Sequence, residues 1–370
     1  MKKTLLIFAL ALGFSGLSQS GANLDTNKWS KEKAKAWYAK HDWITGANFI
    51  PSTAINQLEM WQKDTYDPET IDRELGYAAT IGFNTMRVYL HSLAYKADTT
   101  GFKDRVADYL SIADKHDIQT IFVIFDDVWD ANPKIGKQRE PKTGTHNSGW
   151  MQDPGYPASK EMANSPELKA YVQDIIKTFK DDERVLFWDL YNEPGNNDKN
   201  TESLPLLTSV FKWAREVNPS QPLSVGLWSW GYKELNTFQA QHSDIITYHD
   251  YENAAMHRRV IELLKTHDRP MICTEYMARE FGTTFKFSLP IFKKYEVGCY
   301  NWGLVAGKSQ THFGWSTIAD LQKLKQEKKF LTLEDPIPEP EIWFHDIFRT
   351  DGSAFDDSEV LFIQSMIKNS

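Results

Sequence analysis

The sequence predicts a single (β/α)₈ barrel of the TIM type, and three observations support this fold class. Short apolar runs alternate with segments whose apolar residues recur every three or four positions, which is typical of parallel strands joined by helical crossovers. Eight such runs lie between residues 43 and 302. About 350 residues remain after a short leader, and this length suits one barrel domain.

The expected strands are apolar and end abruptly at polar residues or turns. In chain order they cover residues 43–50, 83–90, 120–125, 185–193, 223–227, 244–249, 270–275 and 297–302. The third of them runs directly into Asp126. Strands that alternate with helices in this way pair in parallel, so their carboxyl ends meet at one face of the barrel.

The helices between the strands are predicted from their apolar stripes. Asp67 and Pro68 have the residue types that begin a helix. The stripes consist of Ile71, Leu75 and Ala78; Phe102, Val106, Leu110 and Ala113; Leu168, Val172, Ile175, Ile176 and Phe179; Leu206, Val210, Phe211 and Ala214; and Val260, Leu263 and Leu264. Two further helices, over residues 339–348 and 358–367, are expected to close the barrel.

The first twenty residues have the pattern of a secretion signal. Lys2 and Lys3 supply the positive start, residues 5–14 form a short apolar run, and small residues precede Gly21. The run is too short to cross a bilayer comfortably, although an uncleaved membrane anchor is the alternative. We therefore expect a signal peptide over residues 1–20 and a periplasmic or secreted protein without a membrane anchor in its mature form.

Residues 25–370 are expected to form one domain, because the sequence has no internal repeat and no linker rich in Pro, Gly or Ser. The exception to the regular pattern is residues 127–166, which lack periodicity. A loop of this length is either functional or mobile. It either closes over the cleft, with Trp129 or Trp150 stacking on a ligand, or forms a solvated loop anchored by one tryptophan.

Composition narrows the classes of partner. The net charge of −8 argues against a nucleic-acid partner. The only two cysteines, Cys273 and Cys299, fall on the last two strands and are either buried free thiols or a single disulfide. No Cys/His group has zinc spacing, so neither metal nor cofactor is expected. The 13 Trp, 15 Tyr and 21 Phe suit core packing and also sugar binding.

Two glutamates occupy matching positions. Glu193 ends the fourth expected strand and Glu275 ends the seventh, so each carboxylate follows a short apolar run. A carboxylate at a buried strand end is costly unless it is used. Strands four and seven lie roughly opposite each other across a barrel, so both groups are expected in one cleft. They are the pair that a retaining glycosidase needs, as proton donor and nucleophile.

Arg87 is the candidate cation for this cleft. It lies on the second strand among apolar residues, where an unpaired guanidinium would be costly. It either keeps a catalytic carboxylate ionised or pairs with a structural acid such as Asp189, which shares strand parity with Glu193.

These residues resemble the glycoside hydrolases of clan A, and most closely the cellulase-like family 5. The resemblance covers the whole barrel and rests on Asn192-Glu193-Pro194, the strand-seven Glu275, the strand-two Arg87 and a strand-eight Trp302. It implies that Glu193 is the general acid/base and Glu275 the nucleophile. It also implies that Arg87 keeps Glu275 ionised.

The same resemblance implies the surrounding contacts. Asn192 would bind the 2-hydroxyl of the sugar in the −1 subsite, and Trp302 would form the floor beneath that sugar. His249 and Tyr251 match the family's His-x-Tyr, with Tyr251 donating to Glu275. The family commonly has a histidine after strand two or three, but strand three here ends at Asp126. We therefore include Asp126 and His91 as candidates for the remaining sugar contacts.

The expected function is that of a retaining β-glycoside hydrolase acting on a carbohydrate substrate. We expect it to use no cofactor and to be a monomer. A catalytically silent glycan-binding barrel is one alternative, since fold alone does not fix function. A metal-dependent barrel hydrolase is another, although the ten histidines are scattered along the chain. The sequence leaves open both the sugar and whether the enzyme cuts within a chain or at its end.

Overall fold

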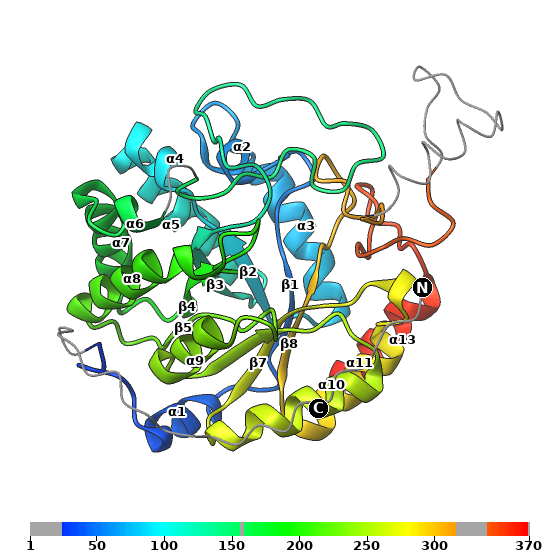
Figure 1. The fold of residues 1–370 in the computed structure, drawn as a ribbon. Helices are drawn as coiled ribbons and strands as arrows, with labels where there is room; N and C mark the ends of the chain where they lie inside the picture. The colour runs from blue at the N-terminus through cyan, green and yellow to red at the C-terminus, as the bar shows by residue number, and fades with distance from the viewer. Residues whose placement is uncertain (1–23, 156–158, 316–338, 369–370) are drawn as a thin grey trace.

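The computed structural model describes residues 24–155, 159–315 and 339–368, so the expected signal peptide lies outside the described residues. Eight parallel strands form one sheet in the order β5-β4-β3-β2-β1-β8-β7-β6. A parallel bridge between Leu227 and Tyr248 joins the region after β5 to β6 and closes the sheet into a barrel (Figure 1). The predicted barrel architecture is confirmed for this part of the chain.

Each expected strand is present, with slightly different bounds. The strands are β1 Thr45–Asn48, β2 Thr85–Tyr89, β3 Gln119–Asp126, β4 Val185–Asn192, β5 Leu223–Ser224, β6 Ile246–His249, β7 Met271–Tyr276 and β8 Gly298–Trp302. Strand β5 is shorter than the predicted 223–227, and the rest of that run contributes only the closing bridge.

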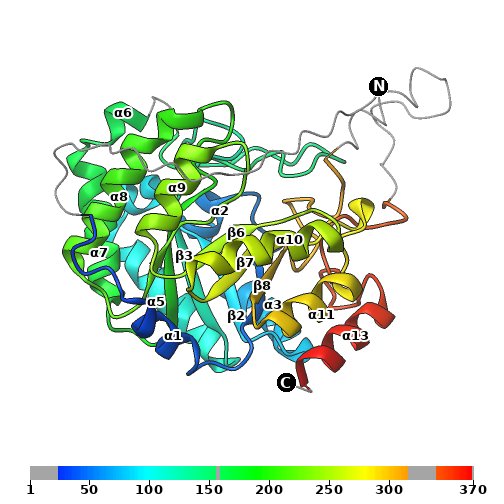
Figure 2. The same cartoon turned by 60° about the horizontal axis from the view of Figure 1, so that its bottom comes forward.

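Helices surround the barrel, as the two views show (Figures 1 and 2). The α-helices are α1 Lys31–Tyr38, α2 Gln57–Trp61, α3 Pro68–Ile81, α4 Ser92–Ala97, α5 Thr99–Lys115, α6 Ser159–Met162, α7 Pro166–Phe179, α8 Leu204–Val217, α9 Lys233–His242, α10 Ala254–Leu264, α11 Phe285–Tyr295 and α13 Asp357–Lys368. Short 3₁₀ turns cover Asn200–Ser203, Lys265–His267 and Arg279–Phe281.

Helix α3 illustrates how the sequence sets these boundaries. Pro68 occupies its first turn, and the Asp67 carboxylate accepts a hydrogen bond of 3.0 Å from the backbone N–H of Thr70. The helix ends at Gly82, whose φ of 94° is a conformation that glycine adopts at little cost. Its predicted apolar stripe is fully buried.

The interior of the barrel changes character along its axis. Toward the amino-terminal ends of the strands it is apolar, and Trp29 and Ala34 from the α1 region pack against it. The barrel residues of this cluster are Ile44, Ile121, Leu186, Phe187, Ile245, Ile272 and Tyr300. Toward the carboxyl ends the interior becomes polar, with Asn48, Arg87 and Asp189 all buried. Polar groups are therefore concentrated at the end of the barrel where active sites of this fold lie.

Two expectations about helices were wrong. Residues 339–348 are not helical over any described part, because their backbone N–H groups bond to distant loops. Phe344 donates to the His312 carbonyl oxygen at 2.9 Å, and Ile347 donates to the carbonyl oxygen of Leu304 at 3.0 Å. On α10, Leu263 does not face inward but is 55% exposed.

The second expected terminal helix is confirmed as α13, which packs beside α3 and α11 (Figure 2). Cys273 and Cys299 are register partners on β7 and β8, and both are free buried thiols. In the described portion of the chain we find no helix with the length and hydrophobicity needed to cross a bilayer.

Candidate active site

A cavity of about 640 Å³ lies at the carboxyl ends of the strands, within the size range of small-molecule sites. Glu193, Asn192, His249, Glu275 and Trp302 line it together. These residues lie on or directly after four different strands, and the first and last of them are more than 100 positions apart in the sequence. The structure therefore brings together the central residues that the sequence singled out.

The two glutamates face one another across this cavity. One carboxylate oxygen of Glu193, one of Glu275 and one ring nitrogen of His249 all lie within 4.8 Å of one another. The side chains of the two acids are 14% and 6% exposed, respectively. Glu193 directly follows β4 with a φ of 45°, a left-handed conformation that costs a non-glycine residue about 1 kcal/mol or more. Strained backbone of this kind is concentrated at functional sites.

Glu275 accepts hydrogen bonds on both carboxylate oxygens. Its Oε1 accepts from Arg87 Nη1 at 2.9 Å and from the Tyr89 hydroxyl at 3.0 Å. Its Oε2 accepts from the Tyr251 hydroxyl at 3.0 Å, so the expected contact between Tyr251 and Glu275 is present. Donors on both oxygens favour the ionised form of the carboxyl group.

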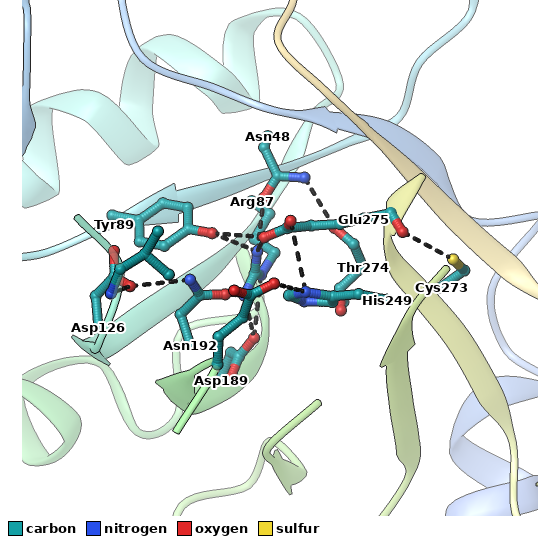
Figure 3. Close-up of polar contacts among 12 residues, drawn as sticks. Asn48, Arg87, Tyr89, Asp126, Asp189, Asn192, His249, Cys273, Thr274 and Glu275 are labelled. Carbon is teal, nitrogen blue, oxygen red and sulfur yellow. Dashed lines mark hydrogen bonds and ion pairs between the residues drawn. The ribbon is translucent and has the colours of Figure 1, made fainter. Parts of the chain in front are cut away.

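Arg87 is fully buried at the centre of this network (Figure 3). Besides Glu275, it donates from Nε and Nη2 to Asp189 Oδ2, at 3.0 and 2.8 Å. It also donates to the side-chain oxygens of Asn48 at 2.7 Å and Asn192 at 2.8 Å. One guanidinium thus contacts both Asp189 and Glu275, the structural and the candidate catalytic carboxylate.

His249 lies between the two glutamates. Its Nδ1 is 2.8 Å from Glu193 Oε1 and 3.5 Å from Glu275 Oε2. Burial lowers the pKa of His249 to about 4, so the ring is neutral near pH 7. Because Nδ1 faces two carboxylate oxygens, the tautomer with the proton on Nδ1 fits this position, and that N–H donates. Its Nε2 has no hydrogen-bond partner among the described residues.

The two carboxyl groups have different surroundings. Burial raises the pKa of Glu193 to about 7, and its neutral donors are His249 and Asn196, whose Nδ2 is 2.6 Å from Glu193 Oε2. Burial raises the pKa of Glu275 as well, and the Glu193 carboxylate adds to that rise, while His249, the Arg87 guanidinium and the Tyr251 hydroxyl act against it. Direct contact with a cation favours the ionised form of Glu275 over that of Glu193.

Asn192 is held in one orientation by its neighbours. The Asn192 Oδ1 accepts a hydrogen bond from Arg87, which can only donate. The Asn192 Nδ2 therefore faces Asp126, and it donates to Asp126 Oδ1 at 2.9 Å. Asp126 also accepts from Trp150 Nε1 at 2.7 Å, and burial raises the pKa of Asp126 to about 8. Asp126 lies behind the cavity rather than on its surface, so it contacts Asn192 and not the space that a sugar would fill.

The predicted tryptophans occupy three different settings. Trp302 lines the cavity and is 8% exposed. Trp129 also lines the cavity and is 42% exposed. Trp150 is 2% exposed and packs behind Trp302, with ring centroids 5.4 Å apart. Of the two loop tryptophans, only Trp129 is therefore placed to touch a ligand.

His91 is not placed to contact a sugar. It is fully buried and outside the cavity lining, where its Nδ1 accepts from Leu93 N at the start of α4. The same nitrogen is 3.5 Å from Asp153 Oδ1. The physical reason is local: His91 lies two residues after the end of β2 and serves as the amino-terminal cap of the next helix.

Several residues of the site were missed in the sequence, some behind the cavity lining and some in it. Tyr89 could have been found, because it lies two positions after Arg87 and so shares its face of the strand. Trp228 and Trp230 follow the fifth strand directly, which was also a usable signal. Trp315 and His345 come from distant irregular segments, and no local pattern places them at the cavity.

The spacing of Glu193, His249 and Glu275 would also allow a metal ion among the described residues. The charges around them argue for another use. Arg87 already lies 2.9 Å from Glu275, where its positive charge both neutralises that carboxylate and repels a second cation. The arrangement is better suited to proton transfer and nucleophilic attack than to metal binding.

Comparison with known proteins identifies the family. A model of the cellulase family, glycosyl hydrolase family 5, matches residues 44–317. No curated protein matches the chain significantly by sequence. Similar solved structures include a GH5_18 variant from Streptomyces cattleya bound to Manβ1-4GlcNAc (TM-score 0.57, 11% identity, covering 89% of this chain and 81% of that one).

Two endo-β-1,4-mannanases have the same fold. The enzyme from Thermotoga petrophila has a TM-score of 0.56 and 14% identity, covering 90% of this chain and 77% of its own. The enzyme from Rhizomucor miehei has a TM-score of 0.54 and 12% identity, and the match covers 89% of this chain and 94% of that enzyme. At these identities the structures support the fold, while the family model matches most of the sequence. The chain belongs to glycosyl hydrolase family 5 of clan A.

Proposed function

We propose that this protein is a retaining β-glycoside hydrolase with Glu193 as general acid/base and Glu275 as nucleophile. The observation that carries the proposal is the approach of the two carboxyl groups, whose nearest oxygens are within 4.8 Å. Retaining enzymes have carboxyl groups about 5–5.5 Å apart, whereas inverting enzymes need about 6.5–9.5 Å to admit a water. The spacing supports direct attack by one carboxylate.

The hydrogen bonds support this division of the two roles. Glu275 contacts Arg87 and two tyrosine hydroxyls, which favour the ionised carboxylate that a nucleophile requires. No lysine or arginine in the described ranges contacts Glu193, and its pKa of about 7 keeps a substantial protonated fraction near neutral pH. A carboxyl group with a raised pKa is suited to general-acid catalysis.

The reaction follows from these roles. Glu275 attacks the anomeric carbon and forms an ester, while the bond to the leaving oxygen breaks and that oxygen takes the proton of Glu193. Glu193, now a carboxylate, removes a proton from water, which attacks the same carbon and releases Glu275. The two inversions give net retention, and these steps require no metal or cofactor.

The neighbouring residues would hold the sugar between the acids. Asn192 has one amide hydrogen directed to Asp126, and the other is available for the sugar 2-hydroxyl, a contact that strengthens as charge develops. Trp302 would form the platform below the ring. His249 donates to Glu193, and Tyr251 orients Glu275.

The substrate is proposed as a β-linked oligo- or polysaccharide. The similar structures named above are described as β-1,4-mannanases or as bound to Manβ1-4GlcNAc, so β-1,4-mannosides head the panel to be tested. Glucan, xylan and galactoside substrates complete it. We further propose that the mature protein is periplasmic or secreted and monomeric.

The test uses Glu275→Ala and Glu193→Ala on aryl β-glycosides, with Glu262→Ala on an exposed surface as the matched control. Both active-site variants should lose at least a thousandfold in kcat, and the control should be unchanged. Azide should rescue Glu275→Ala with an α-glycosyl azide product and Glu193→Ala with a β-glycosyl azide. Full activity in either variant would overturn the assignment.

Two control measurements separate this proposal from its alternatives. Glycan binding by calorimetry without any turnover over a long incubation would identify a silent binding barrel instead. Activity that is abolished by a chelator and restored by a divalent cation would favour a metal-dependent enzyme. The proposed mechanism predicts turnover that is unaffected by the chelator.

A further inference from the structure

In the part of the chain that the structure describes, the cavity has a wall on one side of the barrel and exposed side chains on the other. Among the described residues, those that line it belong to β4, β6, β7 and β8 or to the segments that follow β3 to β8. The segments after β1 and β2 contribute none of them. A cleft that admits a long chain must be open at both ends, so the wall decides where a glycan can be cut.

The wall is built by residues 127–155, here called the β3 loop, which arches over the barrel end in Figure 1. Its contacts with the segment after β1 are buried and specific. Asn56 Nδ2 donates to the Gly149 carbonyl oxygen at 2.9 Å, and Gln57 Nε2 donates to that of Met151 at 2.9 Å. Both amide side chains are fully buried or nearly so. Breaking such contacts would leave buried polar groups unpaired.

The β3 loop is also joined to the segment that follows β8. The Asn147 N–H donates to the Ser309 carbonyl oxygen at 2.8 Å. His146 Nδ1 is 2.9 Å from the carbonyl oxygen of Phe313, and its ring lies against that of Trp129. Three segments therefore form one continuous wall across the β8, β1 and β2 side of the barrel.

The space behind the sugar platform is too small for another sugar. Trp150 packs against Trp302 and Tyr89, with ring centroids 5.4 and 5.0 Å away. The residual cavity between them and the wall is about 10 Å³, which is roughly room for a single water. A glycan therefore cannot continue past Trp302 in this direction.

The opposite side carries exposed aromatic surface beside Glu193. Trp228 and Trp230 follow β5 and line the cavity, and Trp230 is 39% exposed. Asn196, which contacts Glu193, lines the same side. Because the general acid must touch the leaving oxygen, the leaving group has to extend toward this open side.

We infer that the enzyme cuts at a chain end, releasing one sugar unit from the non-reducing end of a β-linked glycan. This inference rests on the proposed function. The terminal sugar lies over Trp302 against the wall, and the shortened chain leaves past Trp228 and Trp230. The bond from the terminal C1 to the leaving oxygen breaks, Glu193 supplies the proton to that oxygen, and water finally supplies the hydroxyl on the released sugar.

The first test follows products from β-1,4-mannotetraose and cellotetraose labelled at the reducing end, with 4-nitrophenyl β-monosides and β-biosides alongside. We expect the monosaccharide and the labelled trisaccharide as the first products. We also expect the monoside to release nitrophenol at least tenfold faster than the bioside. Initial disaccharide products, or faster release from the bioside, would show a second glycone subsite and overturn the inference.

The second test concerns the open side. Trp230→Ala should raise KM for the tetrasaccharide about tenfold, as expected for loss of roughly 1.4 kcal/mol of stacking on an aromatic face. Phe287→Ala, which removes an exposed ring on α11 outside the cavity, is the matched control and should have no effect. An unchanged KM in Trp230→Ala would contradict the assigned direction of the leaving chain.

The two proposals fail in different ways. Internal cleavage that is lost in Glu275→Ala would refute the chain-end inference and leave the retaining mechanism intact. Absence of turnover on every aryl glycoside and glycan would refute both.

Discussion

Replacing Glu275 with glutamine should lower the pKa of Glu193 by about 1–2 units from its value of about 7. The substitution preserves shape but removes a negative charge that disfavours ionisation of Glu193. It also removes the ionic partner of Arg87, whose positive charge then acts more strongly on Glu193. Both changes act in the same direction.

The magnitude follows from the geometry. Two unit charges 4.8 Å apart interact by about 3.5 kcal/mol at an effective dielectric constant of about 20, and by about 0.9 kcal/mol in bulk water. These energies correspond to about 2.5 and about 0.6 pKa units. Each charge is spread over two oxygens, so the expected change lies between these limits.

The assay is a titration of ¹³C-labelled glutamate side chains by NMR in the wild type and in Glu275→Gln, with Glu193→Gln to assign the Glu193 resonance. Glu262→Gln, an exposed residue on α10, is the control and should leave the Glu193 titration unchanged. A change below about 0.3 units in Glu275→Gln would be smaller than the bulk-water limit. That result would refute the claim that the two carboxyl groups face each other.

Three further predictions test other parts of the site. The value of kcat/KM should fall as pH rises through about 7, because the proton on Glu193 is required. This fall should vanish when Glu193→Ala is assayed with activated aryl substrates. A fall that persists in that variant would belong to another group. Arg87→Met should lower the free energy of unfolding by roughly 3–5 kcal/mol in urea denaturation, because Asp189 and Glu275 lose their buried cation. The control Arg258→Met, at an exposed position, should change it little. Equal effects of the two substitutions would contradict the role of Arg87. Asp126→Ala should lower kcat about tenfold with little change in KM, because Asn192 loses the acceptor that orients it. An unchanged kcat would count against this positioning role.

The parts of the fold that sequence could predict are those governed by local periodicity. Apolar runs and helical stripes identified the strands and most helices, because burial of one face repeats along the chain. The same runs located Glu193 and Glu275, since parallel strands bring their carboxyl ends to one face. The expected strand near residue 223 was too long, because Gly226 and its neighbours leave the ladder after Ser224.

The parts that failed depend on contacts between distant segments. Residues 339–348 have helix-compatible residues, yet their backbone bonds to loops near residues 304 and 312. His91 has the right residue type for a sugar contact, but it caps α4. The wall formed by the β3 loop rests on side chains such as Asn56 and Gln57, whose partners lie more than 90 positions away. No local pattern in the sequence predicts such pairings.

The central claim is that Glu275 forms a covalent bond to the sugar. The most direct measurement is to incubate the enzyme with a 2-deoxy-2-fluoro β-glycoside carrying an activated leaving group and to locate the label by peptide mass spectrometry. We predict one fluoroglycosyl group per chain, attached to Glu275. A label on Glu193, or rapid release of a product with inverted configuration and no labelled enzyme, would contradict the account.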